Sequence, residues 1–169
     1  MQQHRSNVAR VDKEITGFYV ACEKTQYGFA GGPCIHPDGT EDKKSWEVRI
    51  AGPPNTPYVG VAYKVHVTLP AEFPFEPPGL RFVPPILHCH VDPRTGRVQP
   101  EVLLHPWLGS MSVVDYLISL FAMMKVCLNQ SVEPLNAEAA ECFHRTPIEF
   151  EEMVYANVLE NHADSDSEH

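Results

Sequence analysis

Residues 61–69 restrict the fold most strongly, because large apolar side chains recur there at every second position. These apolar side chains are Val61, Tyr63, Val65, Val67 and Leu69. Such alternation predicts a strand that buries one face and leaves the other face mixed. Residues 45–52 show the same pattern in Trp46, Val48 and Ile50. The link between the two strands contains three prolines and excludes regular structure, so we expect an antiparallel pair.

A helix is expected before these strands. Apolar residues near the N-terminus recur every three or four positions, which predicts one apolar face on a helix over residues 5–25. They are Val8, Val11, Ile15, Phe18 and Cys22. The glycines and the proline in residues 28–33 oppose helix continuation. We expect a short strand over residues 34–36 and a turn over residues 36–39.

The segment after the second strand is rich in proline. Residues 70–78 contain four prolines, each of which removes a backbone donor and restrains the residue before it. This predicts a stiff loop that displays Phe73 and Phe75, although packing within the loop is the preferred interpretation for Phe73. A short further strand is expected over residues 80–83.

Three helices are expected in the C-terminal half. The first, over residues 113–128, follows Ser110 or Ser112 as N-cap and is apolar around most of its surface, so it should pack centrally on the sheet. Asn136 starts a short helix over residues 136–143, and Pro147 opens the last helix. The packing groups of that last helix are Ile148, Phe150, Met153, Val154 and Val158. One helix, antiparallel strands and three further helices define an α+β domain.

The charge of the chain limits its partners. The formal net charge is −9, and seven acidic residues follow Pro147, where Lys and Arg are absent. An acidic chain without a clustered basic stretch argues against a nucleic-acid binder. We expect a single domain over residues 1–160 and an acidic, disordered tail over residues 161–169.

Neither the termini nor the cysteines indicate secretion or a membrane. Residues 1–14 lack the apolar core of a secretory signal, and the longest apolar run contains Asp115 and Lys125. The five cysteines are odd in number and widely spaced, which fits reduced thiols better than disulfides. They are Cys22, Cys34, Cys89, Cys127 and Cys142. We therefore expect an intracellular protein, cytoplasmic, nuclear or both, without a membrane partner.

The long loop over residues 88–107 is the candidate site. It begins with two histidines that flank a cysteine, passes Gln99 and ends at Trp107. Binding and catalytic groups concentrate on long irregular loops held by a rigid scaffold. The residues alone give a location for a site and no reaction.

Four blocks of sequence, in order, resemble the catalytic domain of the ubiquitin-conjugating enzyme family. They are WEVRIAGPPNTPYVG from Trp46, FPFEPPGLRF from Phe73, the loop that contains Gly96 and Trp107, and PLNAEAA from Pro134. Their shared order and spacing carry the resemblance, which extends from Val8 to about Val158. It implies an N-terminal helix, a four-stranded antiparallel meander and three C-terminal helices.

In this family, one cysteine after a Gly-x-Ile/Val pattern carries ubiquitin as a thioester. The matching segment here is Gly96-Arg97-Val98-Gln99, so an amide occupies the position of the nucleophile. Glutamine supplies neither the attacking thiolate nor the leaving group. The family's His-Pro-Asn reads His88-Cys89-His90, which replaces the asparagine that stabilises the oxyanion, and the residue after the nucleophile position is Pro100. The resemblance therefore implies a catalytically inactive member, for which we expect no cofactor and no metal.

Further likenesses concern the walls of the site and its partners. Glu133 matches the acidic residue beside the family's active site, and Phe75 matches the aromatic residue that contacts ubiquitin ligases. The second ligase-contact loop, Trp-Ser-Pro-Ala in active members, is here Trp107, Leu108, Gly109 and Ser110. The implied partners are an active conjugating enzyme, a ligase or ubiquitin. The chain retains the last two helices, so it resembles a full-length pseudoenzyme more than the shorter inactive variants.

Three alternatives compete with this interpretation. Cys89 is a candidate nucleophile for an unconventional transferase, although its match to a packed proline favours a small buried group; Cys34, Cys127 and Cys142 lie away from the loop. A zinc site built from His88, Cys89, His90 and His105 is disfavoured because adjacent residues point in different directions, and His88 fits a structural role better. A scaffold unrelated to ubiquitin is the third alternative. We predict an adaptor or regulator in ubiquitin or ubiquitin-like modification, without enzyme activity of its own.

Overall fold

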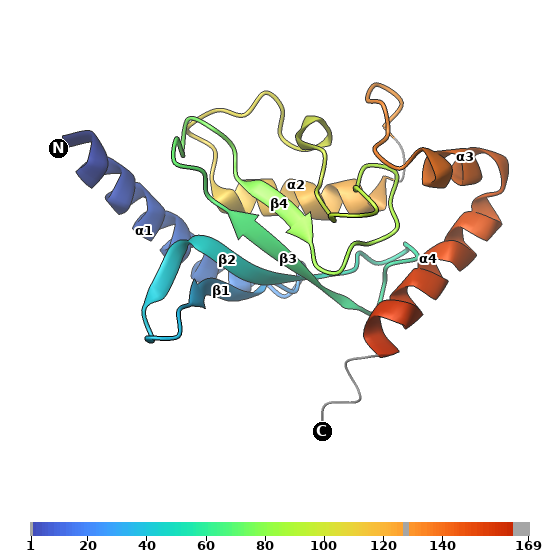
Figure 1. Ribbon diagram of the computed structural model, residues 1–169, viewed down its shortest axis with the longest axis horizontal. Helices are drawn as coiled ribbons and strands as arrows, with labels where there is room; N and C mark the ends of the chain where they lie inside the picture. Colours follow the sequence, from blue (N-terminus) through green and yellow to red (C-terminus); the bar gives the residue numbers. More distant parts are fainter. Residues whose placement is uncertain (1, 127–128, 164–169) are drawn as a thin grey trace.

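The sheet is a four-stranded antiparallel meander in the order β1-β2-β3-β4 (Figure 1). The computed structural model describes residues 2–126 and 129–163. The strands are β1 Ala30–Ile35, β2 Glu41–Ala51, β3 Ala62–Thr68 and β4 Gly79–Phe82. The predicted antiparallel pairing of the two alternating stretches is confirmed, with Trp46 opposite Val67 and Ile50 opposite Tyr63.

The first two strands extend further than the sequence suggested. Strand β1 begins at Ala30, inside the glycine-rich stretch that we expected only to interrupt the helix. Gly31 has a φ of 95°, and a Cβ there would lie 2.2 Å from the carbonyl oxygen of Glu47. Glycine therefore allows the close approach of β1 to β2, which is why a stretch of poor strand formers is a strand here.

The residues that the structure describes form four α-helices around the sheet's inner face and ends, in the order that the sequence predicted. They are α1 Gln2–Cys22, α2 Val113–Lys125, α3 Ala137–Arg145 and α4 Pro147–Ala163, and a 3-10 turn, η1, spans Pro100–Val102. Ser112 caps α2 by accepting from the backbone N–H of Asp115, whose carboxylate accepts from the N–H of Ser112 in return. Asn136 caps α3. Helix α2 ends at Lys125, before the predicted end at 128, and residues 127–128, including Cys127, lie outside the described residues.

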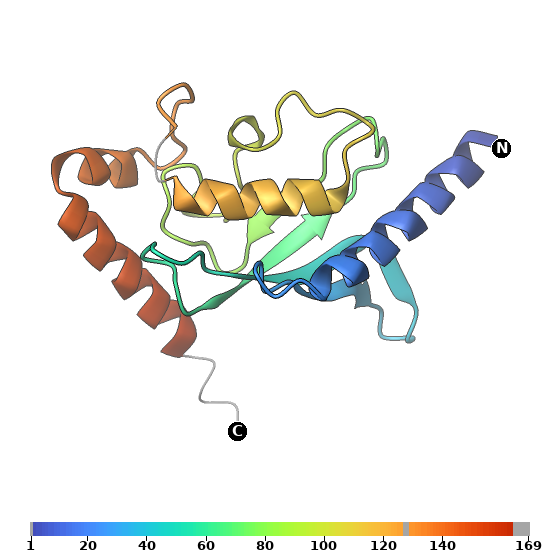
Figure 2. The same cartoon turned by 180° about the vertical axis from the view of Figure 1, so that it is seen from behind.

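Helix α2 covers the inner face of the sheet, as Figure 2 shows from behind. Its buried residues are Val113, Tyr116, Leu117, Leu120, Phe121, Met123 and Met124. They meet the inward side chains of the strands, of which Trp46, Val48 and Ile50 are fully buried. The central position predicted for this helix is confirmed. Loops from β4 to α2 can therefore be held against a rigid, two-layered core.

The preferred interpretation of Phe73, packing within its loop, is confirmed, since Phe73 is 3% exposed, whereas Phe75 is 68% exposed as predicted. One packing assignment needs correction. Ile148 is 75% exposed rather than packed, because Phe150 and Val154 take the buried face of α4. Ile148 is two residues from Phe150, about 200° around the helix.

No helix among the described residues is long and apolar enough to cross a membrane. Helix α4 continues to Ala163, and residues 164–169 of the expected acidic tail lie outside the described residues.

Candidate functional site

A tight hairpin forms the first half of the candidate loop. Val91 pairs with Val98, and the backbone N–H of Asp92 donates to the carbonyl oxygen of Arg97 over 2.9 Å. The Asp92 carboxylate accepts from the N–H groups of Arg94 and Thr95, and these bonds hold the pKa of Asp92 below its ordinary value. The turn over residues 93–96 is therefore closed by the side chain of Asp92.

Gly96 fixes this hairpin to the edge of the sheet. Its carbonyl oxygen accepts from the N–H of Phe82, and the N–H of Val98 donates to the carbonyl oxygen of Leu80. Gly96 has a φ of 75°, and a Cβ there would lie 2.0 Å from the carbonyl oxygen of Phe82. Only glycine fits this position without a shift. The residue three positions later, Gln99, is placed by this attachment.

Both ends of the Gln99 side chain are hydrogen-bonded. Its Oε1 lies 2.8 Å from Nδ1 of His90, and its Nε2 donates over 2.6 Å to the backbone carbonyl oxygen of Glu133. The N–H of Asn129 donates to Nε2 of His90, so the imidazole proton sits on Nδ1 and is donated to Gln99. Three bonds in series thus join residues 88–90, Gln99 and the segment after α2. The amide that occupies the position assigned to the nucleophile is part of the structure of the loop.

His88 lies beneath this network and is fully buried. Its Nδ1 accepts from the N–H of His90 over 3.0 Å, and its Nε2 donates to the carbonyl oxygen of Met123 over 3.2 Å. Burial, followed by the nearby His90, lowers the pKa of His88 to about 4. The ring is therefore neutral at pH 7, and both of its nitrogens are used. This is the structural histidine that the sequence favoured.

The cysteines differ in their access to solvent. Cys89 is fully buried, and its carbonyl oxygen accepts from the N–H of Asn136 at the start of α3. Cys34 lies in β1, which is separated from β4 by two strands, and Cys142 lies in α3 near Thr146. Burial of Cys89 agrees with the small core group that the sequence favoured. Within the described part of the chain, no three His, Cys, Asp or Glu side chains gather as a metal ion would require.

Glu133 contributes its backbone to the site. Its side chain is exposed, and its carbonyl oxygen is the group that binds Gln99. A cleft of about 440 Å³ adjoins this segment, between His90, residues 102–104 and the outer side of α2. The sequence did not identify Asn129 as part of the site. Asn129 acts through its backbone N–H, a group that every residue except proline carries, so its side chain gave no signal.

Trp107 joins the two loops that the resemblance assigned to ligase contact. Its Nε1 donates over 2.8 Å to the carbonyl oxygen of Pro74, and its ring meets Tyr116 edge-on at 5.2 Å. This brings Phe75 and Leu108 to one end of the molecule, where they are 68% and 54% exposed. Arg10 of α1 donates to the carbonyl oxygens of Gly109 and Met111, and Ser110 is exposed.

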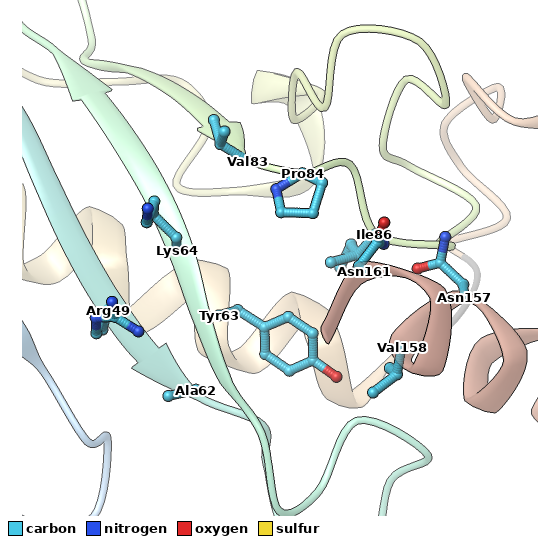
Figure 3. A pocket seen from close by; sticks show the side chains of 10 residues that line it. All are labelled: Arg49, Ala62, Tyr63, Lys64, Val83, Pro84, Ile86, Asn157, Val158 and Asn161. Carbon is cyan, nitrogen blue, oxygen red and sulfur yellow. The ribbon is translucent and has the colours of Figure 1, made fainter. Parts of the chain in front are cut away.

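A second hollow lies away from Gln99, between β3 and α4 (Figure 3). Its volume is about 170 Å³. The ring of Tyr63 points into its centre, with Asn157 and Asn161 of α4 on the far side. The amide of Asn157 accepts from the N–H of Leu87, and that of Asn161 donates to the carbonyl oxygen of Pro85. These bonds hold α4 against the segment that leads to His88.

Comparisons with known proteins agree with this architecture. A sequence profile described as ubiquitin-conjugating enzyme matches residues 10–158. The ubiquitin-conjugating enzyme E2-20 kDa of Schizosaccharomyces pombe is 33% identical over 123 residues, which cover 73% of this chain and 68% of the relative. Ubiquitin-conjugating enzyme E2 K of Homo sapiens is 32% identical over 113 residues, 66% of this chain and 56% of the relative. The chain therefore spans little more than half of the human relative.

A solved structure supports the same assignment. The E2 domain of a Toxoplasma gondii ubiquitin-conjugating enzyme is 26% identical and superposes with a TM-score of 0.72, covering 89% of this chain and 94% of that one. The helix, the meander and the C-terminal helices thus define an α+β domain of the ubiquitin-conjugating type, and the predicted fold class is confirmed. The chain belongs to the ubiquitin-conjugating enzyme family.

Proposed function

We propose that this protein is a catalytically inactive member of its family that acts as an adaptor or regulator in ubiquitin or ubiquitin-like modification. It works inside the cell through contacts with an active conjugating enzyme, a ligase or ubiquitin. The observation that carries the proposal is Gln99, whose amide is bonded at both ends to His90 and Glu133 at the position assigned to the thioester cysteine.

The chemistry of the transfer supports inactivity. A thiolate must attack the ubiquitin adenylate, and the thiol must later leave when the acyl group moves on. The amide of Gln99 can do neither. His90 stands where the family has its asparagine, and its N–H is already donated to Gln99, so it offers no free donor to an oxyanion in this arrangement.

The unconventional transferase is the second candidate, because Cys89 lies in the same loop. Its full burial opposes this role, since a thiol must meet the carboxyl end of a protein substrate at the surface. A scaffold unrelated to ubiquitin is the third candidate. Binding measurements with purified ubiquitin, conjugating enzymes and ligase domains test this candidate. If none of them binds, the unrelated scaffold is favoured.

A charging assay tests the proposal. The protein is incubated with activating enzyme, ATP and ubiquitin and then separated without reductant. We expect no reductant-sensitive ubiquitin adduct. Such an adduct would show that the protein is active, and its loss in Cys89→Ala would identify Cys89 as the nucleophile.

The Gln99→Cys variant tests whether the loop itself is competent. We expect incomplete charging, because His90 loses the acceptor of its Nδ1 proton and Pro100 still follows the new thiol. Gln130→Cys places a thiol at an exposed position after α2 and controls for non-specific transfer to any accessible thiol. Efficient charging of Gln99→Cys alone would mean that His90 and Pro100 matter less than we propose.

A further inference from the structure

Basic side chains gather on the outer face of the sheet, although the whole chain carries a net charge of −9. In Figure 1 this face of β3 and β4 is turned toward the viewer, with α2 behind it. Its members, here called the basic face, are Arg49, Lys64, His66, Arg81 and Arg97, of which Figure 3 shows Arg49 on β2 and Lys64 on β3. The basic face is thus a local exception on an acidic protein.

The register of the strands places like charges directly opposite one another. Arg49 is the partner of Lys64, and Arg81 is the partner of Arg97. Directly opposed like charges destabilise a sheet. Glu47 offsets part of this, since its carboxylate lies 3.5 Å from Nζ of Lys64 and 3.6 Å from Nε2 of His66.

The arginines have no such compensation. Among the residues that the structure describes, neither Arg49 nor Arg81 nor Arg97 forms an ion pair. Arg81 instead lies 3.3 Å from Nδ1 of His66, and the carboxylate of Asp92, near Arg97, is engaged by the N–H groups of its turn. The fold does not require these charges, because neighbouring positions on the same face hold neutral residues such as Thr68.

A groove of about 410 Å³ continues from the basic face along the edge of the sheet. It lies between residues 77–81 and residues 95–100, and the residues that line it include Arg81, Arg97 and His66 but no Asp or Glu. Leu80, Leu103 and three prolines add apolar surface. Tyr116 also lines the groove. Burial, and secondly the negative charge of Glu101, raises the pKa of the Tyr116 hydroxyl to about 12.

We propose that the basic face and this groove bind an acidic segment of a partner protein, with an apolar side chain among its carboxylates. The row from Glu47 through His66 and Arg81 to Arg97 crosses β2, β3, β4 and the bridged segment at Arg97, and its three spacings add to about 14 Å. An extended peptide of about four residues has this length. A nucleic acid or an anionic membrane needs a wider basic surface and would meet the acidic remainder of the molecule. The site does not depend on the inactivity proposed for Gln99.

Fluorescence anisotropy with the fluorescein-labelled octapeptide DEDLFEDE tests the site. We expect saturable binding at ~50 mM salt that weakens as salt screens the charges. Arg81→Glu with Arg97→Glu should weaken binding at least ~10-fold, because two attractive charges become repulsive. The control pair Lys13→Glu with Lys24→Glu changes the net charge equally on exposed residues elsewhere and should alter the affinity by no more than ~2-fold. Replacing Leu and Phe of the peptide by Ser should also weaken binding, through the groove.

Several results would overturn the proposal. One is the absence of saturable binding at peptide concentrations up to about 1 mM. Another is an equal loss of peptide affinity in the control pair. A third is Arg81-dependent binding of single-stranded oligothymidine or phosphatidylserine vesicles that is tighter than binding of the peptide. The neutral pair Arg81→Gln with Arg97→Gln repeats the measurement with less change to the fold. Urea denaturation of each variant separates loss of binding from loss of structure.

Discussion

At the scale of single residues, Gln99 and His90 form a matched pair. The sequence showed them as two separate departures from the family pattern, whereas the structure shows that the imidazole N–H of one is donated to the amide oxygen of the other. His90 is 1% exposed, so that N–H has no access to bulk water. Replacement of Gln99 alone leaves the buried N–H of His90 without its partner. The loop is therefore stabilised by side-chain bonds that a cysteine at position 99 would not form.

The Gln99→Ala variant measures what this pair contributes. It removes both side-chain bonds and leaves the buried N–H of His90 unpaired, so we expect the free energy of unfolding to fall by about 1–3 kcal/mol. Urea denaturation gives this value. Gln130→Ala, at an exposed glutamine in the same segment, should change stability by no more than about 0.5 kcal/mol. Equal effects of the two variants would show that the Gln99 network is not stabilising.

His88 makes stability depend on pH in a window set by its own pKa. Its folded pKa of about 4 lies below the ordinary value of 6.5, so folding favours the neutral ring. Its stabilising contribution is complete above pH 6.5 and is lost as pH falls toward 4. Linkage gives a loss of about 2 kcal/mol between pH 7.5 and pH 5. Urea denaturation at several pH values in this range measures the loss.

An NMR titration of the His88 ring separates this effect from other titrating groups. The His88 ring should stay neutral from pH 7.5 to pH 5 in the folded protein. Protonation of His88 near pH 6.5 in the folded protein would contradict the predicted source of the pH dependence.

At the scale of elements, α2 depends on a single cap. The sequence left Ser110 and Ser112 as alternatives, and the structure selects Ser112, which forms a reciprocal capping box with Asp115. Ser112→Ala should reduce the free energy of unfolding by about 1 kcal/mol, while Ser110→Ala should change it little. Thermal denaturation should show a lower midpoint by about 2–4 °C for the first variant only. A comparable shift for Ser110→Ala would contradict the assignment of Ser112 as the cap.

Gly96 ties the hairpin of the candidate loop to β4. Gly96→Ala forces a side chain into left-handed backbone and against the carbonyl oxygen of Phe82, so we expect a loss of about 2–4 kcal/mol. Gly39→Ala is the matched control, because its φ is also positive, at 88°, but its Cβ would meet nothing within 4 Å. It should lose only about 1 kcal/mol. Chemical denaturation of both variants isolates the cost of the close approach.

The elements that the sequence predicted well are those whose signal is local. Alternation placed β2 and β3, and Asn136 and Pro147 marked the starts of α3 and α4. Strand β1 was missed at Gly31 because its reason is a close approach to β2, which no local pattern reveals. Order and spacing assign Gln99 to the nucleophile position, which stays a prediction, and they gave no sign of its bonds. These bonds run to His90, nine positions away, and to the backbone of Glu133, thirty-four positions away.

At the scale of the whole molecule, the two proposed surfaces draw on different interactions. The basic face relies on charge and weakens with salt. The exposed side chains of Phe75 and Leu108 rely on apolar burial, which salt affects little. A partner that uses both surfaces would therefore lose only part of its affinity at high salt.

The apolar pair gives a prediction about partner binding. Phe75→Ala with Leu108→Ala should weaken binding to a purified ligase RING domain at least ~10-fold, because exposed apolar groups at an interface carry much of its binding energy. The same pair should leave the unfolding free energy within about 0.5 kcal/mol of the parent, because both side chains are exposed. Ile148→Ala, equally apolar and exposed but on α4, should leave binding unchanged.

Trp107→Ala distinguishes a structural from a contact role at the same end of the molecule. It removes the bond to Pro74 and the packing on Tyr116, so it should destabilise the fold by about 2 kcal/mol as well as weaken binding. Calorimetry and thermal denaturation on the same samples separate the two effects. If the Phe75 and Leu108 variants destabilise the fold as much as Trp107→Ala does, these side chains serve the loop rather than a partner, and the ligase contact loses its support.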